Sequence, residues 1–114
     1  MITARQEYTV VSGKVAEALA WLQEVQSWDC YRLIYPYGCR VWSTSMGRVH
    51  KVVLEAEYAS LHERLSCLRR ATRQPVFQAW RERQRHYCLN VYSGYSNPAR
   101  SESAERFDLS RLWL

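Results

Sequence analysis

Two stretches of the chain alternate apolar and polar residues with the period of a β-strand. Residues 2–11 place Ile2, Ala4, Tyr8 and Val10 on one side and Thr3, Arg5, Glu7 and Thr9 on the other. Residues 49–58 repeat the pattern, with His50, Val52, Leu54, Ala56 and Tyr58 on the apolar side. Because successive side chains of a strand point to opposite sheet faces, each stretch predicts a strand with one buried face.

Segments with helical spacing lie between and after these strands. Ser12 and Gly13 predict a helix start, and apolar residues three or four apart continue to about residue 26. Ser60 and Glu63 have the form of a capping box, with a leucine stripe at Leu61, Leu65 and Leu68 behind it. Pro75 predicts the first turn of another helix, which carries apolar residues to Tyr87.

Two further strands complete the expected sheet. Residues 31–43 are rich in β-formers but are interrupted by Pro36 and Gly38, which predicts a bulged or edge strand. The turn-forming residues 43–47 predict that it pairs with residues 49–58 as a hairpin. Residues 89–95 return to a β pattern and predict the last strand.

The resulting order is strand, helix, strand, strand, helix pair, strand. This predicts an α+β fold of the ferredoxin-like βαββαβ type, with the helices on one sheet face. The other face would carry Arg5, Glu7, Val49, Lys51, Val53, Glu55 and Glu57. The chain also has 15 aromatic residues, more than one small core usually absorbs, so we expect two copies to pack sheet to sheet as a homodimer.

The length of 114 residues fits a single domain. We expect residues 1–96 to form this domain. The polar, turn-rich segment that follows leads to apolar residues at the end of the chain. Residues 97–114 are therefore predicted to be a C-terminal tail that docks on the domain or on a partner subunit.

Charge and cysteine content favour some classes of protein over others. The net charge is +5, and arginine supplies most of the positive charges. The arginines of residues 69–85 are spread around the helix and mixed with Glu82, which favours a solvated surface over nucleic-acid binding. No apolar run approaches the roughly 20 residues of a membrane span. Residues 1–7 lack the apolar segment of a secretory signal, and the four cysteines form no C-x-x-C pair, so we expect a cytoplasmic protein with reduced thiols.

Three segments of the chain resemble NIPSNAP-like proteins of the dimeric α/β-barrel superfamily. They are residues 8–14 (Tyr-Thr-Val-Val-Ser-Gly-Lys), residues 48–64, and residues 74–80 (Gln-Pro-Val-Phe-Gln-Ala-Trp). The resemblance implies a homodimer whose two sheets form a barrel, sometimes with a ligand cavity between sheet and helices. The chain departs from the family at residues 35–38, where a Gly-rich segment is usual, and in the tail after Asn97. The family has no single agreed activity.

Aromatic residues form the first candidate site. A pocket between sheet and helices could be lined by Tyr8, Tyr35, Trp42, Tyr58, Trp80 and Tyr87. Mostly apolar walls with a few polar tips are typical of small-molecule sites, and ordinary core packing is the alternative interpretation. His50 is the candidate catalytic residue, because it opens the apolar side of a strand where a neutral imidazole could act as a base. A structural histidine at the start of that strand is the alternative.

These observations predict a small homodimeric NIPSNAP-like protein that binds an apolar or aromatic small molecule. The alternative is a cofactor-independent monooxygenase that uses the same cavity, with His50 and tyrosine hydroxyls in proton transfer. The resemblance extends weakly to haem-degrading enzymes, but Arg81 occupies the position where an axial histidine would be expected. Metal-ligand spacings and nucleotide-binding or hydrolase motifs are absent, so we expect neither metal nor cofactor. The sequence leaves open whether the chain is an enzyme.

Overall fold

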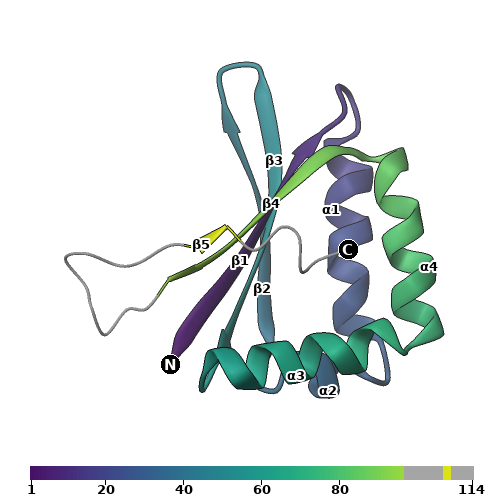
Figure 1. Ribbon diagram of the computed structural model, residues 1–114. Helices are drawn as coiled ribbons and strands as arrows, with labels where there is room; N and C mark the ends of the chain where they lie inside the picture. Colours follow the sequence, from purple (N-terminus) through teal and green to yellow (C-terminus); the bar gives the residue numbers. More distant parts are fainter. Residues whose placement is uncertain (97–106, 109–114) are drawn as a thin grey trace.

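The computed structural model describes residues 1–96 and 107–108. Its sheet is built from β1 (Ile2–Val10), β2 (Cys39–Met46), β3 (Val49–Tyr58), β4 (Cys88–Ser96) and the short β5 (Phe107–Asp108). The strands lie in the order β2-β3-β1-β4-β5, and every neighbouring pair is antiparallel. The two central strands, β1 and β3, come from different βαβ halves, so the fold is the predicted α+β, ferredoxin-like arrangement (Figure 1).

Helices cover one face of this sheet (Figure 1). They are α1 (Val15–Gln23) with its 3-10 extension η1 (Glu24–Ser27), α2 (Tyr31–Ile34), α3 (Leu61–Thr72), and α4 (Pro75–Arg83) with the 3-10 turn η2 (Gln84–His86). In Figure 1, α1 and α4 run side by side along the sheet, while α3 crosses near the end where the chain begins. Within the described residues, no helix is long and apolar enough to cross a membrane.

The strand register determines which side chains face the helices. In β1, Ala4, Gln6 and Tyr8 are buried on the helical side, and the intervening Arg5 and Glu7 are half-buried on the open side. This alternation confirms the period-two prediction.

The predicted strand over residues 31–43 is wrong in its first half. Residues Tyr31–Ile34 form α2, and the amide of Tyr35 donates to the Tyr31 carbonyl at 2.8 Å. The chain then turns through Gly38, whose φ of +80° is a conformation that glycine tolerates best. The Tyr31 hydroxyl accepts a 2.8 Å bond from the Cys39 amide as β2 begins. These backbone groups are satisfied locally, so the β-forming side chains do not extend the sheet.

The predicted capping box of α3 is confirmed. The Ser60 hydroxyl accepts from the Glu63 amide at 3.1 Å, and the Glu63 carboxylate accepts from the Ala59 amide at 2.9 Å. The first helix differs from its prediction, because Lys14 is its N-cap residue and no side chain caps it.

The buried face of α3 differs from the predicted leucine stripe. It contains Arg64, Cys67, Leu68 and Ala71, whereas Leu61 is exposed. This orientation of α3 about its axis places the guanidinium of Arg64 between the helix and the sheet, in the interior of the protein.

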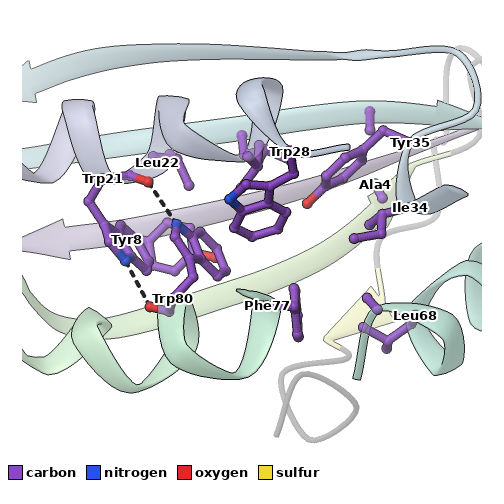
Figure 2. Close-up of a cluster of buried hydrophobic side chains, with 14 of the residues drawn as sticks. Ala4, Tyr8, Trp21, Leu22, Trp28, Ile34, Tyr35, Leu68, Phe77 and Trp80 are labelled. Atoms are coloured by element: carbon purple, nitrogen blue, oxygen red, sulfur yellow. Dashed lines mark hydrogen bonds between the residues drawn. The ribbon is translucent and has the colours of Figure 1, made fainter. Parts of the chain in front are cut away.

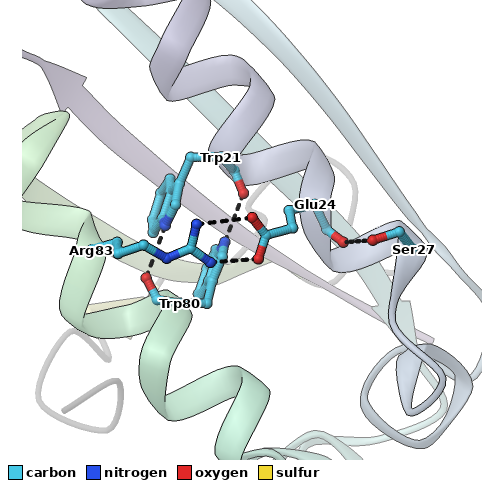
Figure 3. A network of polar contacts seen from close by, with 5 residues as sticks. All are labelled: Trp21, Glu24, Ser27, Trp80 and Arg83. Atoms are coloured by element: carbon cyan, nitrogen blue, oxygen red, sulfur yellow. Dashed lines mark hydrogen bonds and ion pairs between the residues drawn. The ribbon is translucent and has the colours of Figure 1, made fainter.

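Two tryptophans join α1 to α4 (Figure 3). The rings of Trp21 and Trp80 stack with centroids 4.2 Å apart, and each indole donates to the other residue's carbonyl, at 2.8 and 2.7 Å. Beside them, Arg83 forms two hydrogen bonds with the carboxylate of Glu24. These contacts hold α1 and α4 together over the sheet.

Most of the predicted C-terminal tail lies outside the described residues. Within them, β5 pairs Phe107 with Tyr95 and Asp108 with Gly94 at the edge of β4. Docking of the whole tail stays a prediction.

Candidate functional site

A continuous group of buried rings lies between the sheet and the helices (Figure 2). Tyr8 meets Trp21 edge to face at 5.2 Å, and Trp28 meets Trp80 edge to face at 5.6 Å. Phe77 continues the row, with its ring 5.6 Å from Trp80. Strand β1 and helices α1 and α4 thus contribute to one aromatic wall.

A buried arginine lies at the α3 end of this interior. The Arg64 guanidinium donates to the hydroxyls of Tyr58 at 2.9 Å and Tyr95 at 3.2 Å. The Tyr58 hydroxyl in turn donates to the carbonyl of Ile34 at 2.9 Å. Since only 4% of Arg64 is exposed, its charge depends on such polar neighbours to offset the loss of water.

Burial holds the nearby phenols in their neutral form. It raises the pKa of Tyr58 to about 12, although the charge of Arg64 acts in the opposite direction. Burial also raises the pKa of Tyr35 well above its usual value. Both hydroxyls are therefore hydrogen-bond donors at neutral pH, and neither is suited to act as a base.

Several polar groups in the same interior have no hydrogen-bond partner among the described residues. They include the side-chain amide of Gln6, the indole nitrogen of Trp28 and the hydroxyls of Tyr35 and Ser93. Gln6 and Tyr35 are only 2% and 1% exposed. Folded proteins rarely leave such groups unpaired, so they mark a place where water or a ligand is expected.

Five of the six predicted ligand-binding residues lie on this side of the sheet. Tyr8, Tyr35, Tyr58 and Trp80 are fully buried, and Tyr87 is half-buried with its ring 6.1 Å from Trp21. Their role in ligand binding stays a prediction.

Trp42 is the exception, and the expectation that it lines the interior is wrong. It pairs with Val53 in the β2–β3 ladder, and its ring lies 5.5 Å from the guanidinium of Arg5 on the open sheet face. A strand's register decides which face each side chain occupies, and the register of β2 follows from where the α2 turn ends.

His50 lies away from the aromatic wall, near the hairpin end of β3. It is half-buried and pairs with Ser45. With Ser12, Gly13 and Arg48 it lines a separate surface hollow of about 530 Å³ between the β1–α1 turn and the β2–β3 turn. Its proposed catalytic role stays a prediction.

The open face of the sheet carries a second feature that the sequence did not reveal. Glu55, which is mostly buried, accepts two hydrogen bonds from Arg5, at 2.9 and 2.8 Å, and forms a salt bridge with Arg40. Next to this triad is a hollow of about 570 Å³, whose apolar lining comes from Trp42, Met46, Val49 and Val53. An apolar hollow beside paired charges is typical of a surface that another protein covers.

The sequence analysis did not identify Arg64 or Gln6 as site residues, although the periodic pattern marks both positions as unusual. Gln6 is the one polar residue on the otherwise apolar side of residues 2–11, and Arg64 lies three residues after Leu61 and four before Leu68. A polar residue at an apolar position of a periodic pattern therefore indicates a buried polar site.

The four cysteines are free, and three of them are buried. Burial raises the pKa of Cys88 to about 12. Within the part of the chain that the structure describes, no group of three His, Cys, Asp or Glu side chains could hold a metal ion.

The fold is shared with proteins of known structure. An uncharacterized NIPSNAP domain protein from Burkholderia xenovorans is 25% identical, with a TM-score of 0.67 over 86% of this chain and 94% of that one. A NIPSNAP family protein from Agrobacterium tumefaciens is 19% identical, with a TM-score of 0.71 over 85% of this chain and 91% of that one. The chain is NIPSNAP-like in fold.

A third structure with the same fold is another Agrobacterium tumefaciens protein, 14% identical, with a TM-score of 0.71 over 89% of this chain and 96% of that one. The chain matches no protein-family model and no curated protein. The NIPSNAP-like assignment therefore rests on the fold and on the first structure's sequence identity.

Proposed function

We propose that this NIPSNAP-like chain is a homodimeric protein that binds an apolar or aromatic small molecule between its sheet and its helices. The observation that carries the proposal is the buried aromatic wall that ends in the Arg64–Tyr58–Tyr95 network. Ligand sites typically combine apolar walls with a few convergent polar groups, and this interior has that composition. The free cysteines suit the reducing cytoplasm that we propose as its location.

The homodimer is supported by the open face of the sheet. No helix among the described elements covers this face, and its apolar residues Met46 and Val49 are 84% and 48% exposed. Pairing two such faces about a two-fold axis would bury the open-face hollow of each copy at once. We therefore propose residues 1–96 as one domain that assembles through the sheet.

A cofactor-independent monooxygenase is the alternative function, and it requires a proton-transfer residue next to the bound substrate. It needs His50 to exchange protons with a bound substrate, but His50 lines the hollow at the β2–β3 turn. The phenols of Tyr35 and Tyr58 are held neutral by burial. Binding without catalysis is therefore better supported than oxygenation.

Native mass spectrometry of the purified protein tests both parts of the proposal. We expect a dimer that carries additional mass from a retained small molecule. A dimer without added mass, together with no binding of aromatic probes, would contradict the binding function. A monomer at micromolar concentration would contradict the assembly.

A further inference from the structure

Glu7 and Lys51 are half-buried side chains of opposite charge on the open face of the sheet. Within the residues that the structure describes, they form no ion pair with each other or with any other side chain. Both line the apolar hollow of about 570 Å³ on that face. A charge beside apolar surface loses hydration when a partner covers it, so a partner that covers this hollow has to supply an opposite charge to each.

The strand register places these two charges on one diagonal of the open face. Glu7 lies opposite Val53, and Lys51 is the neighbouring residue of β3 on the same face. Lys51 and Glu7 are therefore separated by one strand and by one step along the strands. The same step continues outward to β2, where Met46 lies opposite Val49, one face position beyond Lys51.

The other end of the diagonal is Gly94 of β4, which lies opposite Arg5, one face position beyond Glu7. With Arg5 and Tyr92, Gly94 lines a small hollow of about 40 Å³. Because small-molecule sites usually have at least roughly 300 Å³, this hollow suits the end of a single side chain. Met46, at the first end of the diagonal, is 84% exposed. The order is thus an exposed apolar side chain, a cation, an anion and a hollow: Met46, Lys51, Glu7 and Gly94.

A two-fold axis can match the two halves of this diagonal. When two sheets pack face to face about an axis that lies between them, each position meets the partner's position on the other side of the axis. We propose that the axis crosses the diagonal at right angles, midway between Lys51 and Glu7. Each Lys51 then pairs with Glu7 of the partner subunit, and each Met46 enters the hollow at Gly94 of the partner subunit. The inference rests on the proposed homodimer and specifies which residues meet in it.

Charge reversal tests the two ion pairs. In Glu7→Lys and in Lys51→Glu, like-charge contacts replace both pairs, so we expect the dissociation constant of the dimer to rise at least about hundredfold. Sedimentation velocity over a range of protein concentrations measures this constant, and circular dichroism establishes that each variant is folded. Glu57→Lys is the matched control, because Glu57 is exposed on the same face but lies off the diagonal, opposite Thr3. It changes the net charge equally and should alter the dissociation constant by no more than about fivefold.

An equimolar mixture of the two charge variants gives the sharper test. A Glu7→Lys chain carries two cations at these positions and a Lys51→Glu chain carries two anions, so both contacts across a mixed dimer are attractive. We expect heterodimers in the mixture although neither variant dimerises alone. Native mass spectrometry detects them when one variant is labelled with a heavy nitrogen isotope. Single variants that dimerise as tightly as the original protein, or a mixture that stays monomeric, would overturn the inference.

Met46→Ala tests the contact at the ends of the diagonal. It should raise the dissociation constant about tenfold, because less apolar surface fills the hollow at Gly94. Leu61→Ala, which removes an exposed side chain from α3 in the helical layer, should leave the constant unchanged. A Met46→Ala dimer as tight as the original would overturn this register while leaving the homodimer intact. An original protein that is monomeric at micromolar concentration would contradict the proposed homodimer as well.

Discussion

Tyr58 connects three parts of the interior through one hydroxyl, which accepts from Arg64 and donates to the Ile34 carbonyl. Its pKa is raised from 10.0 to about 12, with burial as the main cause. The native state therefore favours the neutral phenol. The stability from this group is complete below pH 10 and is lost as the pH rises toward 12.

We expect the free energy of unfolding to decrease between pH 9 and 12. A rise in pKa from 10.0 to about 12 corresponds to roughly 3 kcal/mol for Tyr58. Cys88 adds to the loss from about pH 9, because burial raises its pKa from 9.0 to about 12 and the native state favours the neutral thiol. Urea unfolding curves measured at intervals of pH give this profile.

Tyr58→Phe provides the internal comparison for that profile. The variant should start less stable at pH 8 and lose less stability between pH 10 and 12, since its side chain does not titrate. Tyr37→Phe removes an exposed hydroxyl and should keep the original profile. An unchanged slope in Tyr58→Phe would mean that other groups govern alkaline unfolding.

At the scale of single residues, the sequence predicts exposure better than polar burial. The exposure of Glu57 and the burial of Tyr8 both follow from strand alternation. Burial of Arg64 depends on two tyrosines that come from β3 and β4, far apart in the chain. Only the tertiary structure brings these three side chains together, so helical periodicity alone could not identify the network.

At the scale of elements, two different kinds of contact hold α1 against α4. Trp21 and Trp80 exchange hydrogen bonds in the buried interior, whereas Arg83 and Glu24 pair at the surface with side chains 40% and 32% exposed. We expect Trp80→Phe to destabilise the protein by roughly 2–3 kcal/mol, because it removes a donor from a buried carbonyl and leaves a void. Equilibrium urea unfolding measures this loss.

Arg83→Gln is the matched substitution at the surface pair. It should cost no more than about 1 kcal/mol, because solvent screens exposed ion pairs. If Arg83→Gln proved as destabilising as Trp80→Phe, the ion pair rather than the indoles would be the main link between the helices.

Element order was predictable because each long strand and helix carries its own periodic pattern. The strands β1, β3 and β4 and the helices α1, α3 and α4 occur where periodicity predicted them. The failure at α2 has a physical cause, since its four residues are too few to establish a helical period. Tyr31 and Ile34 favour strands in isolation, and tertiary packing overrides that preference.

At the scale of the whole molecule, the helices described lie on one face of the sheet and leave its open face uncovered within the monomer. The open face combines the Arg5–Glu55–Arg40 triad with an apolar hollow that includes Val49. If two copies pair through this face, a charge placed at Val49 occurs in both copies and is desolvated on assembly. We therefore expect Val49→Lys to convert the dimer to a folded monomer, as measured by size-exclusion chromatography with light scattering.

Leu33→Lys is the control for this prediction, because Leu33 is also about half exposed, at 51%, but lies in α2 on the helical side. It should leave the dimer unchanged, and both variants should keep the thermal stability of a folded domain. Dissociation by Leu33→Lys alone would move the interface to the helical layer. A Val49→Lys dimer as tight as the original would mean that the open face is not the assembly surface, whereas ligand binding between sheet and helices would be unaffected by that outcome.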